Sequence, residues 1–244
     1  MNKFKYIIVG LLVFTSCLKD NDDDLLFDTL EAYVLNKPTE MGAVIACAAS
    51  DVNTNDILTF YYPETGAVNI RFYETATAQV DENDFSNYKQ VVIQNDPFFN
   101  GYLGKFTQAS IIEKWIIVTY ELDNEIKISN PIRSKQNTKP TVWNDNVSIN
   151  QDVAGMPNFT WEDNLFGDNA IYFQVVSDAQ DNLLSGTYTY DDHFQYYDTS
   201  NVVLNITTQT PPLLITANNY NFTLMDVSED NWVNWVILKT FEAQ

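Results

Sequence analysis

Short hydrophobic runs alternate with polar turn residues from about residue 30 to the end of the chain. The runs are rich in Val, Ile, Tyr, Phe and Thr, and clusters of Asn, Asp, Gly and Pro separate them at a spacing of roughly ten residues. No stretch keeps a helical period for more than about three turns. The pattern is typical of an all-β protein and predicts β-sandwiches.

The first half of the chain contains eight predicted strands. They are Glu31–Asn36, Ala43–Ser50, Ile57–Tyr62, Ala67–Tyr73, Tyr88–Gln94, Lys105–Gln108, Trp115–Leu122 and Glu125–Ser129. The last two flank Asp123 and Asn124, which tolerate the positive φ angles of a two-residue turn, so they should form a hairpin.

The polar segment Asn130–Pro140 separates the two halves and has a proline near each end. We interpret it as the connection between two domains, one over residues 29–133 and one over residues 138–244. The second half repeats the strand pattern. Its predicted strands are Pro157–Glu162, Ala170–Asp178, Val202–Thr207, Tyr220–Val227 and Trp232–Phe241.

The second half resembles a fibronectin type III domain over roughly residues 138–244. Phe-Thr-Trp161-Glu forms an early strand, Ile-Tyr-Phe-Gln-Val follows, and Tyr220 comes after Leu213-Leu214. The resemblance implies that Trp161 packs on the opposing sheet and that Tyr220 lies in the penultimate strand. Immunoglobulin-like domains have a similar pattern. The first half shares only its final hairpin with that family.

The N-terminus has the pattern of a lipoprotein signal peptide. Lys3 and Lys5 precede the apolar run Tyr6–Phe14, which is too short to cross a bilayer core of about 30 Å. Small residues then lead to Cys17, which resembles a lipobox. We predict a signal peptide over residues 1–16 and a lipid anchor, carrying palmitate-type acyl chains, on Cys17. The alternative is an ordinary secretory signal that contains a cysteine.

An acidic tether is predicted over residues 17–28. It resembles the export signal that sends lipoproteins of Bacteroidetes to the outer leaflet of the outer membrane. The residues concerned are Lys19, Asp20, Asp22, Asp23 and Asp24. The same run would also serve as a plain solvated tether. Asp28-Thr29-Leu30 resembles an O-glycosylation motif of exported Bacteroidetes proteins, which makes Thr29 a candidate acceptor.

Charge and cysteine content narrow the classes of partner. Without residues 1–16 the chain has 11 basic and 33 acidic side chains, formally −22. This balance argues against nucleic acid and anionic lipid headgroups, which require basic patches. If Cys17 carries lipid, Cys47 has no disulfide partner, and its apolar surroundings predict a buried, unreactive thiol.

Few residues suggest catalysis or metal binding. His193 is the only histidine, and although Asp191 and Asp192 precede it, no nucleophile motif accompanies it. We therefore predict no catalytic residue, no metal site and no cofactor. Calcium remains open at three turns rich in Asp and Asn, although the first lacks the glycine and the bidentate glutamate of an EF-hand. These turns are Asp51–Asp56, Asp81–Asp84 and Asp178–Asn182.

Two groups of aromatic residues in predicted loops are candidate ligand or partner contacts, since exposed aromatics stack on sugars and anchor protein interfaces. The alternative is that they fill the core. They are Phe98, Phe99 and Tyr102, and Phe194, Tyr196 and Tyr197. On the last strand, Trp235 should be buried and Trp232 should cap a loop.

These features favour a non-enzymatic surface lipoprotein. We expect it to be an accessory or binding subunit of an outer-membrane protein complex, attached to the lipid bilayer through Cys17. The alternative is a glycan-binding lipoprotein of a polysaccharide-uptake system. A hydrolase is a more distant alternative.

Overall fold

A computed structural model describes residues 28–207 and 209–244. The predicted signal peptide, Cys17 and the predicted export residues Lys19, Asp20, Asp22, Asp23 and Asp24 lie outside the described residues. Strands dominate the described part, with one α-helix, α1 (Leu30–Val34), and one 3-10 helix, η2 (Phe85–Asn87). No helix in this part has the length and the apolar character needed to span a bilayer.

The first sandwich consists of two sheets. One contains, in spatial order, β1 (Thr39–Val44), β9 (Glu125–Ser129), β8 (Trp115–Leu122), β4 (Val68–Glu74) and β5 (Lys89–Val91), with β10 (Ile132–Arg133) also paired to β8. The other contains β2 (Ala46–Ser50), β3 (Ile57–Tyr61), β7 (Leu103–Gln108) and β6 (Asn95–Phe98).

The second sandwich repeats this plan. Its larger sheet contains β11 (Val142–Asn144), β19 (Val233–Glu242), β18 (Asn219–Ser228), β14 (Asn169–Asp178), β15 (Leu183–Thr189) and β17 (Leu204–Asn205). Its smaller sheet contains β12 (Ser148–Asn150), β13 (Asn158–Thr160) and β16 (His193–Gln195).

In each sandwich, the first two short strands follow each other along the chain but belong to different sheets. In the first, β1 runs parallel to β9 and β2 then runs antiparallel to β3. In the second, β11 runs parallel to β19 and β12 then runs antiparallel to β13. This repeated arrangement is that of immunoglobulin-like and fibronectin type III sandwiches. The fold class predicted from the sequence, all-β with two sandwiches of this kind, is confirmed.

Two residues behave as the fibronectin type III resemblance implies. The ring of Trp161 lies 5.3 Å from that of Tyr172 and 6.1 Å from that of Phe222, both on the opposing sheet. Tyr220 is the second residue of the penultimate strand, and its hydroxyl oxygen accepts a hydrogen bond from the backbone N–H of Ile215 at 3.0 Å. Such a bond to upstream backbone is the tyrosine corner of these domains.

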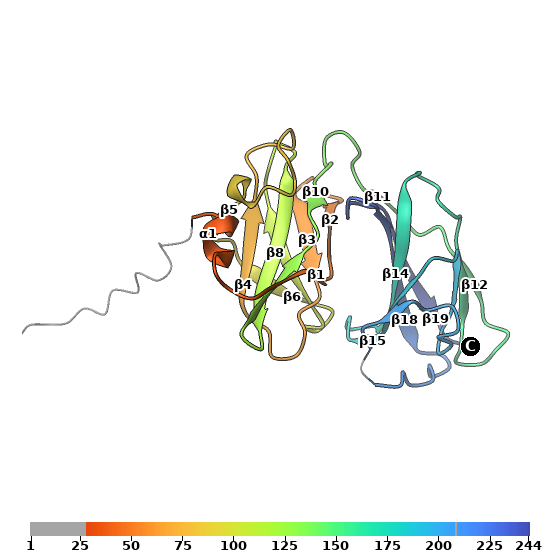
Figure 1. Cartoon of the computed structure of the whole chain (residues 1–244). Coiled ribbons are helices and arrows are strands. Elements are labelled where there is room, and N and C mark those ends of the chain that lie inside the picture. Colours follow the sequence, from red (N-terminus) through yellow and green to blue (C-terminus); the bar gives the residue numbers. More distant parts are fainter. Residues whose placement is uncertain (1–27, 208) are drawn as a thin grey trace, which may run out of the picture.

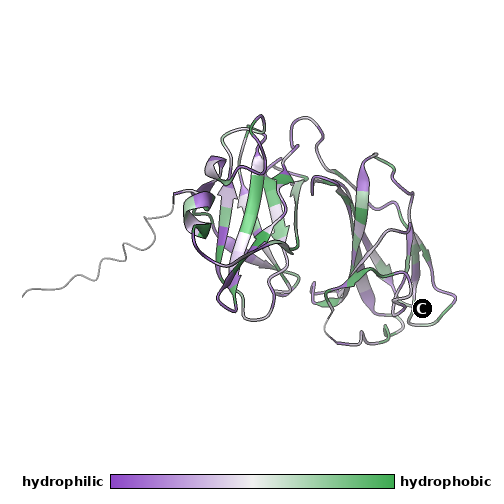
Figure 2. Cartoon of the chain, in the orientation of Figure 1, coloured by the Kyte–Doolittle hydropathy of each residue, from purple (hydrophilic) through white to green (hydrophobic). Residues whose placement is uncertain are grey.

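The four sheets and α1 are stacked in one series (Figure 1). Helix α1 covers the outer face of the β8 sheet, and separate hydrophobic clusters fill the two sandwiches. A further cluster joins the β3 sheet of the first sandwich to the β14 sheet of the second. Apolar residues gather on the strands and hydrophilic residues cover most of the loops (Figure 2).

The predicted hairpin at Asp123-Asn124 is confirmed, with φ angles of 52° and 63° at the two turn residues.

The strand predicted at Glu31–Asn36 is wrong, since α1 occupies most of this segment. The side chain of Thr29 caps the helix by accepting a hydrogen bond from the N–H of Ala32. Leu30 and Tyr33, three positions apart, share the buried face of the helix.

Candidate functional site

The connection between the sandwiches is an ordered part of the structure. Within Asn130–Pro140, Ser134 and Gln136 are buried. Ser134 bonds to the backbone of Lys114, and Gln136 donates to the carbonyl oxygens of Ser110 and Ile112. The Lys135 ammonium lies 2.7 Å from the carboxylate of Asp230 in the second sandwich. These contacts hold the connection against both sandwiches.

The turn between β18 and β19 is inserted into the first sandwich. Trp232 is fully buried and belongs to the first sandwich's core cluster with Ile57, Phe72 and Val118. Its indole N–H donates to the carbonyl oxygen of Lys139 at 2.8 Å. The expectation that Trp232 caps a loop is therefore wrong, since its ring fills the core of the other domain.

Backbone hydrogen bonds fix this insertion. The N–H of Ala48 donates to the carbonyl oxygen of Asn231 at 3.0 Å, and the N–H of Arg133 donates to that of Asp230 at 2.9 Å. Thr141 and Ser50 exchange two bonds between side chain and backbone, at 2.8 and 2.9 Å. These backbone and side-chain bonds connect the two sandwiches directly, in addition to the chain that links them.

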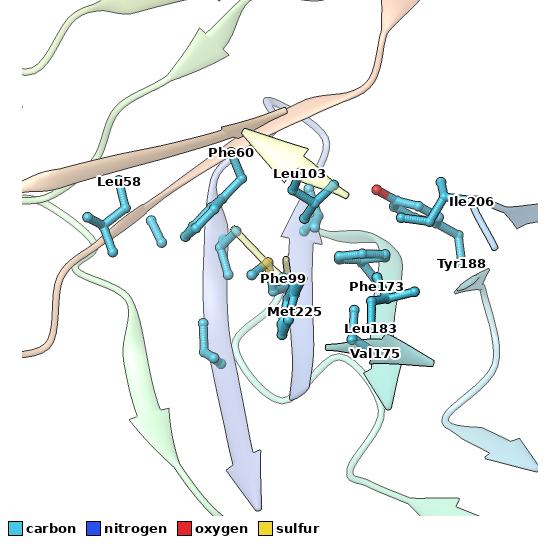
Figure 3. Packing of buried hydrophobic residues seen from close by; sticks show 14 residues of the cluster. Leu58, Phe60, Phe99, Leu103, Phe173, Val175, Leu183, Tyr188, Ile206 and Met225 are labelled. Atoms are coloured by element: carbon cyan, nitrogen blue, oxygen red, sulfur yellow. The ribbon is translucent and has the colours of Figure 1, made fainter. Parts of the chain in front are cut away.

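The turn at Phe98–Tyr102, a predicted exposed contact, lies against the second sandwich instead. Phe99 is buried in the interdomain cluster (Figure 3). Phe98 and Tyr102 are half-buried and pack against this cluster. Phe99 has a φ of 47°, unusual for a bulky residue, and Asn100 and Gly101 continue the left-handed turn. The expected exposure of Phe99 is therefore wrong: the turn directs this ring into the interface of its own chain.

The second predicted aromatic group also lies mostly in a core. Strand β16 pairs with β13, so Phe194 lies opposite Phe159 and is buried. Tyr196 is fully buried, and its hydroxyl donates to the carbonyl oxygen of Pro212 at 2.7 Å. The expected exposure of Phe194 and Tyr196 is wrong, and Tyr197, 41 % exposed, is the member of the group that faces solvent.

The polar candidate residues form their hydrogen bonds with neighbours in the same loop. His193 is exposed, and in the described part of the chain its ring bonds only to the Asp192 carboxylate, at 3.2 Å. The Asp51 carboxylate accepts bonds from the N–H groups of Asn53 and Thr54. The Asn53 bond holds the pKa of Asp51 below its usual value. Within residues 28–207 and 209–244 no three His, Cys, Asp or Glu side chains are grouped so as to hold a metal.

Thr29, the candidate O-glycosylation residue, is half-buried at the start of α1. Its hydroxyl oxygen accepts the capping bond from Ala32 at 3.3 Å. Its backbone also forms an isolated bridge with Lys89, next to the ion pair between Asp28 and Lys89. The motif therefore lies where the chain enters the first sandwich, and glycosylation there stays a prediction.

A cavity of about 170 Å³ lies between the two sandwiches. Its walls come mainly from β1, β2, β3 and β7 on one side and from β14, β15 and β18 on the other, with Asn130 and Asn231 also lining it. Six of the side chains that line it are Cys47, Phe60, Tyr62, Phe173, Tyr188 and Met225. Burial raises the pKa of the Cys47 thiol to about 12, so the thiol is protonated at neutral pH.

Sequence patterns that point to this interface are visible in retrospect. All five residues of β3 are buried, as are the first five of β19. Both segments lack the alternation of apolar and polar residues that a strand with one solvated face would show. A continuous buried run signals a strand covered on both faces, which here means a second sandwich against the first.

Comparisons with known proteins add little. The chain matches no protein-family model and no curated protein. Among solved structures it is similar to the chicken interferon gamma receptor alpha chain, with 10% sequence identity over 85% of this chain and 96% of that chain. The TM-score is 0.24. Strand order and pairing, not this likeness, establish the fold.

A buried carboxyl group lies near the junction. Asp226 is fully buried, and one of its oxygens accepts a hydrogen bond from the side-chain amide of Asn169 at 2.7 Å. The other oxygen has no hydrogen-bond partner among the described residues. Burial raises the pKa of Asp226 above its ordinary value of 3.8, because a buried charge loses hydration.

The variant Asp226→Asn should be more stable than the natural chain at pH 7, by about 1 kcal/mol. A carboxyl group with a raised folded-state pKa stabilises the fold fully below its unfolded pKa, and this contribution is lost as the pH rises through the folded value. The advantage of the variant should therefore shrink as the pH falls from the raised folded-state pKa toward the ordinary pKa, and be smallest below about pH 4. Urea unfolding at pH 7 and pH 3.5 measures both.

Asp178→Asn is the matched control. The pKa of Asp178 is lowered, since its carboxylate accepts bonds from Asn182 and Gln180 although desolvation opposes them. This variant should therefore lose stability at pH 7. If Asp226→Asn were the less stable protein at both pH values, the buried carboxylate would be contributing favourably and our assignment would be wrong.

Proposed function

We propose that this chain is a non-enzymatic, lipid-anchored surface protein of the outer membrane of a Bacteroidetes-type bacterium. In this proposal Cys17 carries the lipid, and the acidic run after it directs the protein to the cell surface. The folded body serves as an accessory or binding subunit of an outer-membrane protein complex.

The stacked arrangement of the two sandwiches is the observation that supports this function best. Asp28 and α1 lie at one end of the stack, and the small sheet of the second sandwich lies at the other end (Figure 1). Cys17 precedes Asp28 by only eleven positions. A rigid body attached near one end holds its other end away from the bilayer, which suits display to a partner.

The distribution of polar residues supports binding rather than catalysis. His193 and Asp192 form an exposed pair with no activated nucleophile bonded to them among the described residues. Nucleophilic catalysis assisted by a histidine–carboxylate pair requires such a partner within hydrogen-bond reach. The Asp-rich turns use their carboxylates to close their own backbone, as Asp81 does with Asn83.

Solvent-exposed apolar residues on the second sandwich are the proposed contact surface for a protein partner. Tyr190 is 65% exposed and Tyr197 is 41% exposed, on either side of β16. Leu213 and Ile215, in the loop before β18, are more than half exposed. Exposed tyrosines combine a large apolar area with a polar tip, which is typical of protein-binding surfaces. The net charge of −20 is unsuited to nucleic acid.

Chemical cross-linking of intact cells followed by purification of the tagged full chain tests this proposal. We expect one outer-membrane protein to be recovered in stoichiometric amount. The variant Cys17→Ala should not incorporate a clickable palmitate analogue, should leave the outer-membrane fraction and should lose this partner. The double variant Tyr190→Ser/Tyr197→Ser should stay anchored but capture at least several-fold less partner, because it loses two central contacts.

His193→Ala is the matched control on the same sandwich and should capture the partner normally. Labelling of Cys17→Ala by the palmitate analogue would contradict the anchor. Recovery of no partner, together with retention of the protein on a glycan array, would support the glycan-binding alternative. Hydrolytic activity that His193→Ala abolishes would contradict a non-enzymatic role.

A further inference from the structure

Tyr188 contributes a hydroxyl group to the lining of the cavity between the sandwiches. Tyr188 is nine-tenths buried, with 9% of its surface exposed, and lines the cavity. No described residue forms a hydrogen bond with its hydroxyl group. Its ring stacks on that of Phe173, with centroids 4.4 Å apart. In Figure 3 its oxygen atom points away from its own strand, toward Leu103 of the first sandwich.

The Tyr188 hydroxyl group keeps some contact with solvent in the cavity, so a water molecule or a ligand can take up its hydrogen-bonding capacity. Burial raises the pKa of Tyr188 well above its ordinary value, which keeps the hydroxyl protonated and able to donate. Much of the remaining wall is apolar, with Phe60 and Leu103 from the first sandwich and Met225 and Val227 from the second. The uncharged polar side chains of Tyr61, Tyr62, Asn130 and Asn231 also line it.

We propose that this cavity binds a small neutral molecule, consisting of one ring or a short alkyl chain with a single hydrogen-bond acceptor directed at Tyr188. The volume of about 170 Å³ sets the size. An apolar protein cavity of about 150 Å³ holds benzene, so this one has room for a ring with a small substituent.

The lining selects against charge. It contains no Asp, Glu, Lys, Arg or His side chain, and its thiol and tyrosine hydroxyls are neutral at pH 7. A carboxylate or ammonium group would lose its hydration there without gaining a counter-ion. A carbonyl or ether oxygen can instead accept the Tyr188 hydrogen bond.

Because each sandwich supplies one wall, the ligand would bind to the interface itself. Sites between domains are common positions for small-molecule binding. A molecule that touches both walls binds the assembled body and not the unfolded chain, so it stabilises the coupled arrangement. This site is independent of the exposed surface proposed for a protein partner.

Three probes of similar shape test the proposal: acetophenone, ethylbenzene and benzoate. The protein is the chain from residue 17 onward with Cys17→Ala, which retains every residue that the structure describes and needs no detergent. By calorimetry and NMR we expect acetophenone to bind with one-to-one stoichiometry and to shift resonances from both sandwiches. Ethylbenzene, without the acceptor, should bind roughly 2- to 10-fold more weakly. Benzoate should not bind.

Tyr188→Phe removes only the hydroxyl group. It should lower the affinity for acetophenone to that for ethylbenzene and leave ethylbenzene binding unchanged. Cys47→Met extends a flexible apolar side chain from the opposite wall and should weaken both neutral probes. Thermal unfolding of each variant checks that it is folded. The proposal is overturned if acetophenone does not bind, or if its affinity is the same in the natural chain and in Tyr188→Phe.

Discussion

Replacing Trp232 by alanine should lower the free energy of unfolding by about 3–5 kcal/mol, the cost of removing a large aromatic ring from a packed core. Trp232 belongs to the second sandwich in sequence, but its ring is fully buried in the core of the first. The cavity left by the variant should therefore lie among Ile57, Phe72 and Val118. Urea denaturation measures the loss.

Hydrogen exchange measures which sandwich loses stability in the variant. With Trp232→Ala, the amides of β8, in the first sandwich, should lose protection at least as much as those of β14. Trp235→Ala is the matched control, because Trp235 is equally buried but lies in the core of the second sandwich. Trp235→Ala should reduce the protection of the β14 amides more than that of the β8 amides. If Trp232→Ala left β8 fully protected, the turn would not stabilise the first sandwich.

Replacing Gly104 by alanine should cost about 3 kcal/mol, at the upper end for overpacking a core. A Cβ atom at this position would lie 2.1 Å from Cζ of Tyr61, which is too close for any real contact. The Tyr61 ring cannot easily move, because it is 2% exposed and stacked on Phe106 with centroids 5.4 Å apart. Thermal and urea unfolding measure the change.

Two further variants separate the clash from a backbone effect. Tyr61→Leu should cost less stability in the Gly104→Ala background than in the natural chain, because it removes the colliding ring. Gly186→Ala should be milder, since its Cβ would meet the side chain of Ile206 at 2.9 Å rather than a fixed ring. Strictly additive costs for Gly104→Ala and Tyr61→Leu would contradict the steric explanation.

The sequence predicted the strands whose local signals are strong. Trp115–Leu122 and Glu125–Ser129 are runs of β-branched and aromatic residues joined by a two-residue turn, and both strands and their hairpin are present. The predicted strands missed β15 and β16, because Ser, Gly, Thr and His residues interrupt their apolar pattern. The short helix α1 was also missed, because its cap and two buried residues gave too little helical period.

The candidate contacts were predicted less well, for a physical reason. An aromatic residue in a turn has the same local sequence whether it faces solvent or a neighbouring sheet. Phe99 and Tyr196 are buried because elements far away in the sequence cover them. Tyr190, one of the most exposed aromatic side chains on the second sandwich, was not among the predicted contacts.

The sequence by itself determined the all-β class, the two sandwiches and the Trp161 and Tyr220 positions of the second one, because alternation of residue types and turn chemistry are local properties. Only the tertiary structure decided that the sandwiches form one stack, that Trp232 fills the core of the other domain and that a cavity with an unpartnered Tyr188 lies between them. These features depend on which sheet faces pair across more than a hundred residues, and the hydrophobic effect that drives such pairing has no direction that a sequence pattern can record.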